Sequence, residues 1–312
     1  MTILTYILAG LVLSLLLVKS AELMIAASSK LARHFSISEY TISFLVIAFA
    51  TSLPELMVGI VSALDNNPSL SYGNVLGSNI ADLTIIISIP ILIGGAISTK
   101  EIIKNKDVIF TMFFGTLPLV LMLDGTLSRL DGTILILGYF FYLVLVLRRS
   151  TPVEGLIEKI RGTNVLKETG IFIFSVVLLL TSADLIVKVA EQIGILANVP
   201  LILIGLTLTA IGTSLPELAF GLKAIKTHHK NEVLGNIVGS VIANSTLVLG
   251  VTSIISPISS STLAGTSSLG FLIGTLALFS FFSYKGRGLG KVEAAILIMT
   301  YIAFVMFERF LL

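Results

Sequence analysis

The sequence contains no cysteine and no tryptophan, and only 12% of its 312 residues are charged. Without cysteine the chain has no disulfide bond, no thiolate metal ligand and no cysteine nucleophile. Without tryptophan, any aromatic belt at a membrane surface has to consist of the seven tyrosines and eighteen phenylalanines. Soluble domains carry about 25% charged residues, so the scarcity of charge argues against a soluble protein.

Hydrophobic residues make up 55% of the chain and form long uncharged runs. A helix needs about 20 apolar residues to cross the hydrocarbon core. We therefore expect an all-α membrane protein with ten transmembrane helices, whose apolar N-terminus is a retained first span and not a cleaved signal peptide. The expected limits are 2–26, 37–64, 71–98, 106–123, 130–148, 167–191, 198–225, 232–256, 265–284 and 291–310.

Positive charge is distributed unevenly between the two sides of this arrangement. Sixteen of the twenty Lys and Arg residues fall in alternate loops, whereas the opposite side has only Arg129 and Arg309. The positive-inside rule places the basic loops in the cytoplasm and both termini outside, in the cell membrane. The formal net charge is +2, and no basic stripe indicates nucleic acid. The expected partners are cations and the lipid bilayer, and no obligate protein partner is evident.

The two halves of the chain repeat one another at a constant offset of 162 residues, without a gap. The matching segments are "SAEL" at 20–23 with "SADL" at 182–185, "IAFATSLPEL" at 47–56 with "TAIGTSLPEL" at 209–218, and "GNVLGSNIAD" at 73–82 with "GNIVGSVIAN" at 235–244. Three matches at one offset indicate an internal duplication.

The duplication suggests how the chain is organised. We expect a first five-helix repeat at 1–148, a cytoplasmic linker at 149–166 and a second five-helix repeat at 167–312. Because five is an odd number of spans, the second repeat enters the membrane from the opposite side. Such inverted repeats are common in secondary transporters, which bind their ions near the bilayer midplane between the repeats.

Both copies of "TSLPEL" place a proline and then an acid inside an apolar span. Proline removes a backbone donor and breaks the helix, so helices 2 and 7 should be broken. The breaks should free carbonyl oxygens around residues 48–50 and 209–211, beside the hydroxyls of the Thr-Ser pairs. Glu55 and Glu217 add carboxylates, each costing about 3 kcal/mol at the bilayer centre. Two such acids facing each other need a cation or protons between them.

The third and eighth spans add polar side chains at a spacing of four residues. Ser78 and Asp82 share one helix face, as do Ser240 and Asn244, and Asn74 and Asn236 extend these faces. Their oxygen atoms are the ligands that Na⁺ and Ca²⁺ prefer. The glycines at 73, 77, 235 and 239 favour close helix packing.

Other ionisable residues have simpler interpretations. Lys19 with Glu22, and Asp184 with Lys188, lie three or four residues apart and are expected to neutralise one another. His228 and His229 lie in a short polar loop, for which we expect a solvated surface and no metal site.

The doubled motif resembles the two alpha-repeats of the sodium/calcium exchanger family, within the wider cation/calcium antiporter superfamily. The alpha-1 motif spans 47–86, the alpha-2 motif spans 209–248, and the resemblance covers nearly the whole chain. A chain without a large cytosolic loop is similar to the compact prokaryotic members. The resemblance implies exchange of Na⁺ for Ca²⁺ by alternating access, with these ions as bound cargo and no cofactor. It also implies that spans 1 and 6 slide across the remaining helices.

The resemblance carries the family's ion-binding positions onto both halves of this sequence, with the two glutamates central to Ca²⁺. They are Ala48, Thr51, Ser52, Glu55, Ser78 and Asp82 in the first half, and Ala210, Thr213, Ser214, Glu217, Ser240 and Asn244 in the second. Ala50 replaces a glycine usual before the first motif. Asp82 and Asn244 are swapped relative to the well-known prokaryotic arrangement, and the lack of an acid at 244 disfavours K⁺ co-transport.

Three alternatives differ from Na⁺/Ca²⁺ exchange in mechanism. An antiporter exchanging H⁺ for Ca²⁺ or another divalent cation would use the same carboxylates. An intramembrane hydrolase built on Ser52 or Ser214 lacks a base, because all three histidines fall in or next to loops. A channel fits broken inverted helices with facing carboxylates less well than alternating access does.

Overall fold

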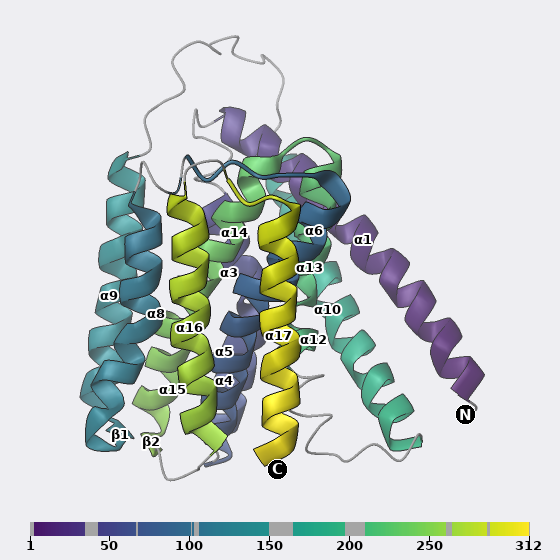
Figure 1. Ribbon diagram of the computed structural model, residues 1–312. Coiled ribbons are helices and arrows are strands. Elements are labelled where there is room, and N and C mark those ends of the chain that lie inside the picture. Colours follow the sequence, from purple (N-terminus) through teal and green to yellow (C-terminus); the bar gives the residue numbers. More distant parts are fainter. Residues whose placement is uncertain are drawn as a thin grey trace.

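The computed structural model describes residues 3–34, 43–66, 68–100, 102, 106–149, 165–196, 210–259, 264–285 and 288–311. Within these ranges the chain is almost entirely helical (Figure 1). The first half consists of α1 (Ile3–His34), η1 (Ser43–Ile47), α3 (Ala48–Thr51), α4 (Leu53–Leu64), α5 (Pro68–Ala81), η2 (Asp82–Ile86), α6 (Ile87–Gly94), α8 (Asp107–Leu121), η3 (Met122–Asp124), β1 (Thr126–Leu127) and α9 (Arg129–Arg149). The second half consists of α10 (Val165–Leu196), α12 (Ala210–Thr213), α13 (Leu215–Lys226), α14 (Lys230–Ala243), η5 (Asn244–Val248), α15 (Leu249–Ile255), β2 (Ile258–Ser259), α16 (Ala264–Tyr284) and α17 (Lys291–Leu311).

The helices follow the order of the expected spans, with some different limits. The first helix continues to His34, beyond the expected end at 26, and α10 continues to Leu196. The beginnings of the second and seventh expected spans, and most of the expected linker, lie outside the described residues. Six described helices are long and apolar enough to cross a membrane, and two shorter apolar helices accompany them. This is therefore an all-helical membrane protein, for which the count of ten crossings stays a prediction.

Two continuous helical segments form the centre of the molecule. The buried share of the most apolar 18 residues differs between the segments. It is 78% in Pro68–Gly94 and 83% in Lys230–Ile255, but only 22% in Arg129–Arg148. The central pair comprises α5–η2–α6 and α14–η5–α15, which occupy corresponding positions in the two halves. In Figure 1, α6 lies near the top whereas α15 lies near the bottom, although each ends its segment. The two central segments therefore run in opposite directions in this view.

The outer helices lie on two sides of this centre. α1 and α10 pack along one another and occupy the right side of Figure 1, and α8 and α9 occupy the left. The exposed apolar side chains of α9 include Leu130, Leu137 and Phe141, which suits contact with lipid. Small β elements also occur, because β1 and β2 pair antiparallel through Thr126–Ser259 and Leu127–Ile258.

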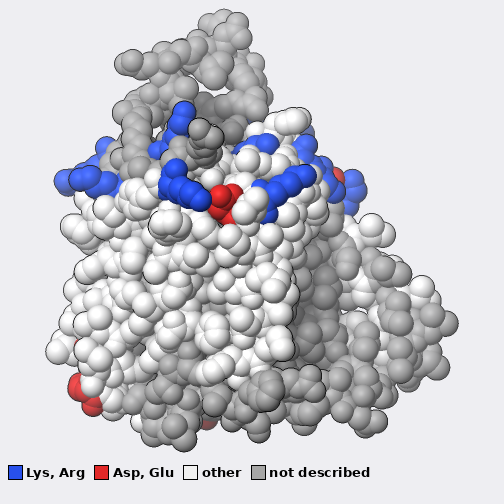
Figure 2. All heavy atoms as spheres, viewed as in Figure 1, with Lys and Arg blue, Asp and Glu red and all other residues white. Residues whose placement is uncertain are grey.

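Lys and Arg gather at one end of the face shown in Figure 2, which we call the basic end. Lys226 and Lys230 flank the junction of α13 and α14 there, and Lys285 and Lys291 flank the junction of α16 and α17. The labelled N- and C-termini lie at the opposite end (Figure 1). Between the two ends the described surface in this view is almost free of charge, as a hydrocarbon-facing surface requires.

Close helix approach is seen at two glycines that were not among the expected ones, and one of the expected glycines lacks it. A Cβ added to Gly73 would meet nothing within 4 Å, so the packing interpretation is wrong there. A Cβ on Gly132 would lie 2.7 Å from the Gly250 carbonyl oxygen, and one on Gly250 would lie 2.9 Å from the Gly132 oxygen. This reciprocal contact joins α9 to α15. For Gly77, Gly235 and Gly239 close packing stays a prediction.

Candidate cation site

Each half of the chain breaks a helix at the sequence Thr-Ser-Leu-Pro-Glu. Ser52 separates α3 from α4 with φ −84° and ψ 4°, and Ser214 precedes α13 with φ −87° and ψ 4°. Pro54 and Pro216 lie in the first turn of the following helix, where a missing N–H removes no hydrogen bond. The predicted breaks are therefore confirmed, and each break is followed by a new helix, α4 or α13.

The backbone carbonyl group of Ala48 remains hydrogen-bonded at the first break. The Ala48 carbonyl accepts the Ser52 backbone N–H at 3.0 Å and lies 3.3 Å from the Thr51 hydroxyl. The break thus does not free this carbonyl, contrary to the expectation, because it keeps its helical hydrogen bond. Ala210 begins α12, and its side chain and residue 209 lie outside the described part of the chain. The roles of Ala48 and Ala210 as ligands stay predictions.

The two glutamates occupy matching positions at the breaks. Glu55 lies in the first turn of α4 and is 0% exposed, and Glu217 lies in the first turn of α13 and is 1% exposed. The N-terminus of a helix carries a partial positive charge that favours a nearby carboxylate. Each half therefore buries one acid at the start of a helix, where its charge is partly compensated.

The polar face of each central helix contacts the break of the other half. In α5, Ser78 Oγ lies 3.1 Å from Thr213 Oγ1, and the Thr213 hydroxyl donates to Asn74 Oδ1 at 3.4 Å. The mirrored contacts join Thr51 Oγ1 to Asn236 Oδ1 at 3.1 Å and to Ser240 Oγ at 3.5 Å. These contacts confirm that Asn74 shares a face with Ser78 and that Asn236 shares one with Ser240. The predicted sharing of these faces by Asp82 and Asn244 stays a prediction. The contacts also join the two halves of the chain at the breaks.

Three acids interact electrostatically in this buried region. The carboxylate of Glu55 lies near that of Asp82, and Glu217 interacts with both. The Ser240 hydroxyl donates to Glu217 Oε1 at 3.2 Å. No Lys or Arg side chain contributes to the environment described for these three carboxylates. The region thus has an excess of negative charge inside the protein.

Hydroxyl groups of Ser78 and Thr213 approach Glu55, and that of Ser214 approaches Asp82. Even so, many oxygen atoms at the site have no hydrogen bond of standard geometry among the described residues. The unpartnered buried oxygens at the site are both carboxylate oxygens of Glu55 and Asp82, Glu217 Oε2, Asn244 Oδ1, Ser52 Oγ and Ser214 Oγ. Buried polar atoms are normally paired, so a concentration of orphaned acceptors needs an explanation. Cations bound among them supply one, because cations pair with acceptors and need no donors.

The chemistry of this ligand set is specific. Among the described residues no group of three His, Cys, Asp or Glu side chains forms a compact metal cage. Hydroxyl, amide and carbonyl oxygens therefore have to complete the coordination around the three carboxylates. An all-oxygen set of this kind suits hard cations such as Na⁺ and Ca²⁺ and does not suit thiophilic metals.

Comparison with known proteins agrees with this chemistry. A family model described as "Sodium/calcium exchanger protein" matches residues 5–148 and 167–309. The chain belongs to the sodium/calcium exchanger family. The two matched ranges correspond to the two halves of the chain, which agrees with its internal duplication. Because this is a family of ion transporters, the protein is not an enzyme, and the hydrolase alternative is excluded.

Relatives resemble this exchanger-family protein over most of their length. It is 33% identical over 310 residues to the putative antiporter CaxA of Alkalimonas amylolytica, covering 96% of each chain. It is 26% identical to the sodium/calcium exchanger MaX1 of Methanosarcina acetivorans, covering 93% of this chain and 94% of MaX1. The solved sodium-calcium exchanger NCX_Mj, soaked with Na⁺ and Sr²⁺, superposes with a TM-score of 0.85 at 26% identity, covering 98% and 99% of the two chains.

Two residues outside the expected set of ion ligands, Asn79 and Ser245, lie beside Asn244 of the exchanger site. Asn244 Nδ2 donates to Asn79 Oδ1 at 3.3 Å, and Asn79 Nδ2 donates to Ser245 Oγ at 2.8 Å. Neither Asn79 nor Ser245 is repeated in the other half, where the equivalent residues are Val241 and Leu83. A search for repeated polar residues therefore passes over them. Their proximity to the site depends on how the two halves pack.

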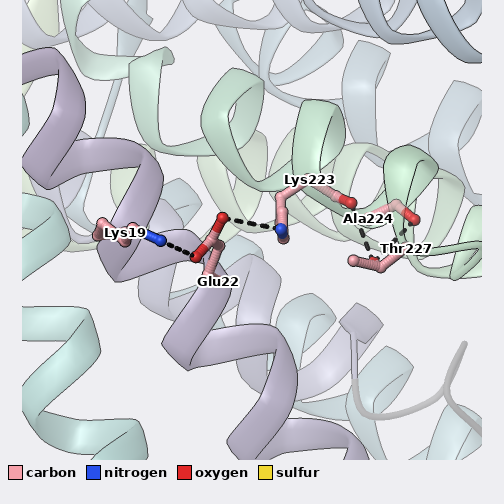
Figure 3. Close-up of polar contacts among 5 residues, drawn as sticks. All are labelled: Lys19, Glu22, Lys223, Ala224 and Thr227. Carbon is pink, nitrogen blue, oxygen red and sulfur yellow. Dashed lines mark hydrogen bonds and ion pairs between the residues drawn. The ribbon is translucent and has the colours of Figure 1, made fainter.

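The ion pair expected between Lys19 and Glu22 is present but involves a third residue (Figure 3). Lys19 Nζ lies 2.8 Å from Glu22 Oε2, and Lys223 Nζ lies 2.8 Å from Glu22 Oε1. Lys223 belongs to α13, so the carboxylate links α1 to the helix that begins at the second break. The side chain of Asp184 lies outside the described part of the chain, so its expected pairing with Lys188 stays a prediction.

The loop histidines differ from one another. His228 is exposed, as the solvated-loop interpretation predicts, and its φ of 66° lies in the left-handed region. His229 Nδ1, in contrast, lies 3.4 Å from Oε1 of the fully buried Glu232. A purely solvated role is therefore wrong for His229, because it packs against a buried acid at the start of α14.

Proposed function

We propose that this protein is a secondary antiporter that exchanges Na⁺ for Ca²⁺ across the cell membrane by alternating access. Its ions bind near the bilayer midplane between two five-helix repeats of inverted topology. The observation that carries the proposal is the set of buried, unpartnered oxygens contributed by both halves around Glu55, Asp82 and Glu217. Because the protein belongs to the exchanger family, we infer that these oxygens bind the ions that are transported.

The charge of the site agrees with such an exchange. Three carboxylates without a basic partner balance three Na⁺ ions. One Ca²⁺ balances two of them, and the third carboxylate then holds a proton or one Na⁺. Each uncompensated carboxylate at the bilayer centre costs about 3 kcal/mol, so a cation-free site is unfavourable. We propose that Glu55 and Glu217, which lie in the first turns of α4 and α13, hold Ca²⁺, and that Asp82 binds a monovalent ion.

The membrane arrangement belongs to the same proposal. We place the basic end in the cytoplasm and both termini outside, following the positive-inside rule. The opposite placement of α6 and α15 in Figure 1 supports inversion of the two repeats. With ten crossings, the first repeat covers 1–148 and the second covers 167–312, joined by a cytoplasmic linker at 149–166.

Exchange of H⁺ for Ca²⁺ is the second candidate, since carboxylates that face no basic group also take up protons. The hydroxyls favour Na⁺, because it needs several oxygen ligands whereas a proton needs one carboxylate. The Ser214 hydroxyl contacts Asp82, and Ser52 Oγ is a buried oxygen without a hydrogen-bond partner among the described residues, so both hydroxyls are available to coordinate Na⁺.

The test is uptake of radioactive Ca²⁺ into proteoliposomes that contain the purified protein. Vesicles loaded with Na⁺ are diluted into Na⁺-free buffer, and a parallel set receives only a pH gradient. We expect the Na⁺ gradient to drive uptake and Glu55→Gln to abolish it. Uptake driven only by the pH gradient would establish the H⁺ alternative, and flux without any counter-ion would indicate a channel.

A matched control distinguishes loss of the site from loss of a buried acid in general. Asp107 is also buried, and it accepts the Tyr142 hydroxyl at 2.5 Å. Asp107→Asn removes its charge and keeps an oxygen that accepts this hydrogen bond, so uptake should survive. If Glu55→Gln transports Ca²⁺ normally, the proposed site is wrong.

A further inference from the structure

We propose that Asn79 is a positioning residue that turns the carbonyl oxygen of the Asn244 amide toward the transported cations. The inference rests on the proposed function, because it concerns a ligand of that site. It starts from the three buried polar residues Ser245, Asn79 and Asn244, each at most 1% exposed. We call these three residues the amide chain.

The hydrogen bonds of the amide chain have a direction. The Asn79 amide donates to Ser245 Oγ at 2.8 Å, which leaves its own oxygen facing Asn244. The Asn244 amide donates to that oxygen at 3.3 Å. Asn244 Oδ1 consequently points away from Asn79 and has no hydrogen-bond partner among the described residues. The amide chain therefore presents the Asn244 oxygen as an acceptor at the site and keeps the Asn244 amide hydrogens away from it.

The opposite orientation would be unsuitable for a cation. Rotation of the Asn244 amide by half a turn would bring two oxygens together at Asn79 and leave both without a donor. It would also direct an NH₂ group, which carries partial positive charge, at the ions. Since an amide binds cations through its oxygen alone, the orientation of Asn244 decides whether it is a ligand.

The two halves differ in a way that matches this requirement. At the position equivalent to Asn244, the first half has Asp82, whose two carboxylate oxygens are both acceptors. Rotation of a carboxylate by half a turn changes nothing, so Asp82 needs no orienting partner. The positions equivalent to Asn79 and Ser245 are the apolar Val241 and Leu83. The orienting residues thus occur only where an amide replaces the acid.

The inference predicts that Asn79 matters only while residue 244 is an amide. Asn79→Val installs the residue found at the equivalent position of the other half. In the native background it should raise the Ca²⁺ concentration for half-maximal uptake about 10- to 100-fold, the usual effect of losing a residue that orients a metal ligand. In the Asn244→Asp background, Asn79→Val should change that concentration little. In each background, the maximal rate of Ca²⁺ uptake should be similar with and without Asn79→Val.

A second comparison avoids any change at residue 244. Ser245→Ala removes the acceptor that fixes Asn79, whereas Ser245→Thr keeps a hydroxyl in the same place. We expect Ser245→Ala to raise the half-maximal Ca²⁺ concentration and Ser245→Thr to leave it close to the native value. Ser71→Ala is the control, because it removes a different buried contact, the 2.9 Å bond between Ser71 and Thr252, away from the amide chain.

The outcomes separate this inference from the proposed function. An equal effect of Asn79→Val in both backgrounds, or equal effects of Ser245→Ala and Ser245→Thr, would show a packing role and overturn the inference. Those results would leave the function intact so long as Glu217→Gln still abolishes uptake. Normal uptake in Glu217→Gln would instead refute the proposed site itself.

Discussion

Asp82 and Asn244 are equivalent by repeat but differ in charge, and this difference concerns the monovalent ion. We expect Asp82→Asn to impair Na⁺-driven Ca²⁺ uptake while exchange of external for internal Ca²⁺ continues. The reason is that Glu55 and Glu217 still balance one divalent ion after the third charge is removed. Isotope exchange between Ca²⁺ on the two sides measures the second reaction. Its complete loss would make Asp82 a Ca²⁺ ligand.

Carboxylates that are ionised in the cation-free site repel one another, which lowers the stability of the protein. We expect Glu217→Gln to raise the unfolding temperature of the protein without divalent ions, because it removes one charge from the cluster. Native protein should gain about 2.7 kcal/mol when Ca²⁺ reaches 100 times its dissociation constant, whereas the variant should gain little. Thermal unfolding in detergent, with and without Ca²⁺, measures both. A variant stabilised by Ca²⁺ as strongly as the native protein would contradict this expectation.

The sequence predicts those residues of the candidate site that occur at equivalent positions in both halves. Glu55 with Glu217, Thr51 with Thr213 and Ser78 with Ser240 stand at equivalent positions, and the structure buries all six. Asn79 and Ser245 could not be predicted in this way, because they lack equivalents. Their roles depend on the approach of α5 to η5, which is a tertiary contact that local sequence does not encode.

At the scale of elements, Glu22 joins α1 to α13 through Lys223 (Figure 3). Reversing one charge, as in Glu22→Lys or Lys223→Glu, should destabilise the protein, and the double reversal should recover stability. We expect a coupling of about 1 kcal/mol, since both side chains are partly exposed. A double-mutant cycle of thermal unfolding measures it. Additive effects would mean that the contact contributes no energy.

The close approach of α9 and α15 gives a second prediction for elements. Gly250→Ala should destabilise the protein by about 1–3 kcal/mol, because the new Cβ would lie 2.9 Å from the Gly132 oxygen and 3.3 Å from the Ile136 nitrogen. Both obstacles are backbone atoms of a neighbouring helix and cannot rotate away. Gly274→Ala in α16 is the matched control, since its Cβ would meet nothing within 4 Å. The measurement is thermal unfolding, and equal effects at the two sites would contradict the packing argument.

Whole-molecule orientation can be tested directly because the chain has no cysteine. We expect a membrane-impermeant maleimide to label Thr126→Cys on intact cells and Lys226→Cys only in inside-out vesicles. Both positions are exposed, Thr126 in β1 and Lys226 at the end of α13. The expectation follows from placing sixteen of the twenty basic residues in the cytoplasm. Labelling of both from one side would refute the proposed topology.

Much of the whole fold was accessible from sequence for a physical reason. A membrane restricts spanning segments to helices of a narrow length range, so apolar runs define the elements without tertiary information. The ends of α1 and α10 were harder to predict, because both helices continue past their apolar stretches. Lys30 near the end of α1 pairs with Glu168 near the start of α10 at 3.0 Å. That polar contact joins the end of α1 to the start of α10, and it depends on tertiary packing that the apolar pattern does not encode.

The wide π-helical turns η2 and η5 begin at Asp82 and Asn244 and occupy equivalent positions in the two halves. In each, a threonine hydroxyl, from Thr84 or Thr246, bonds a carbonyl of the preceding turn. π-helical turns are rare inside α-helices and often occur at functional sites. Both halves have the turn at the same register, and the residues that flank it have closely similar backbone angles. The acid and the amide therefore begin the same wide turn in the two halves, and they differ in charge without a change in the backbone around them.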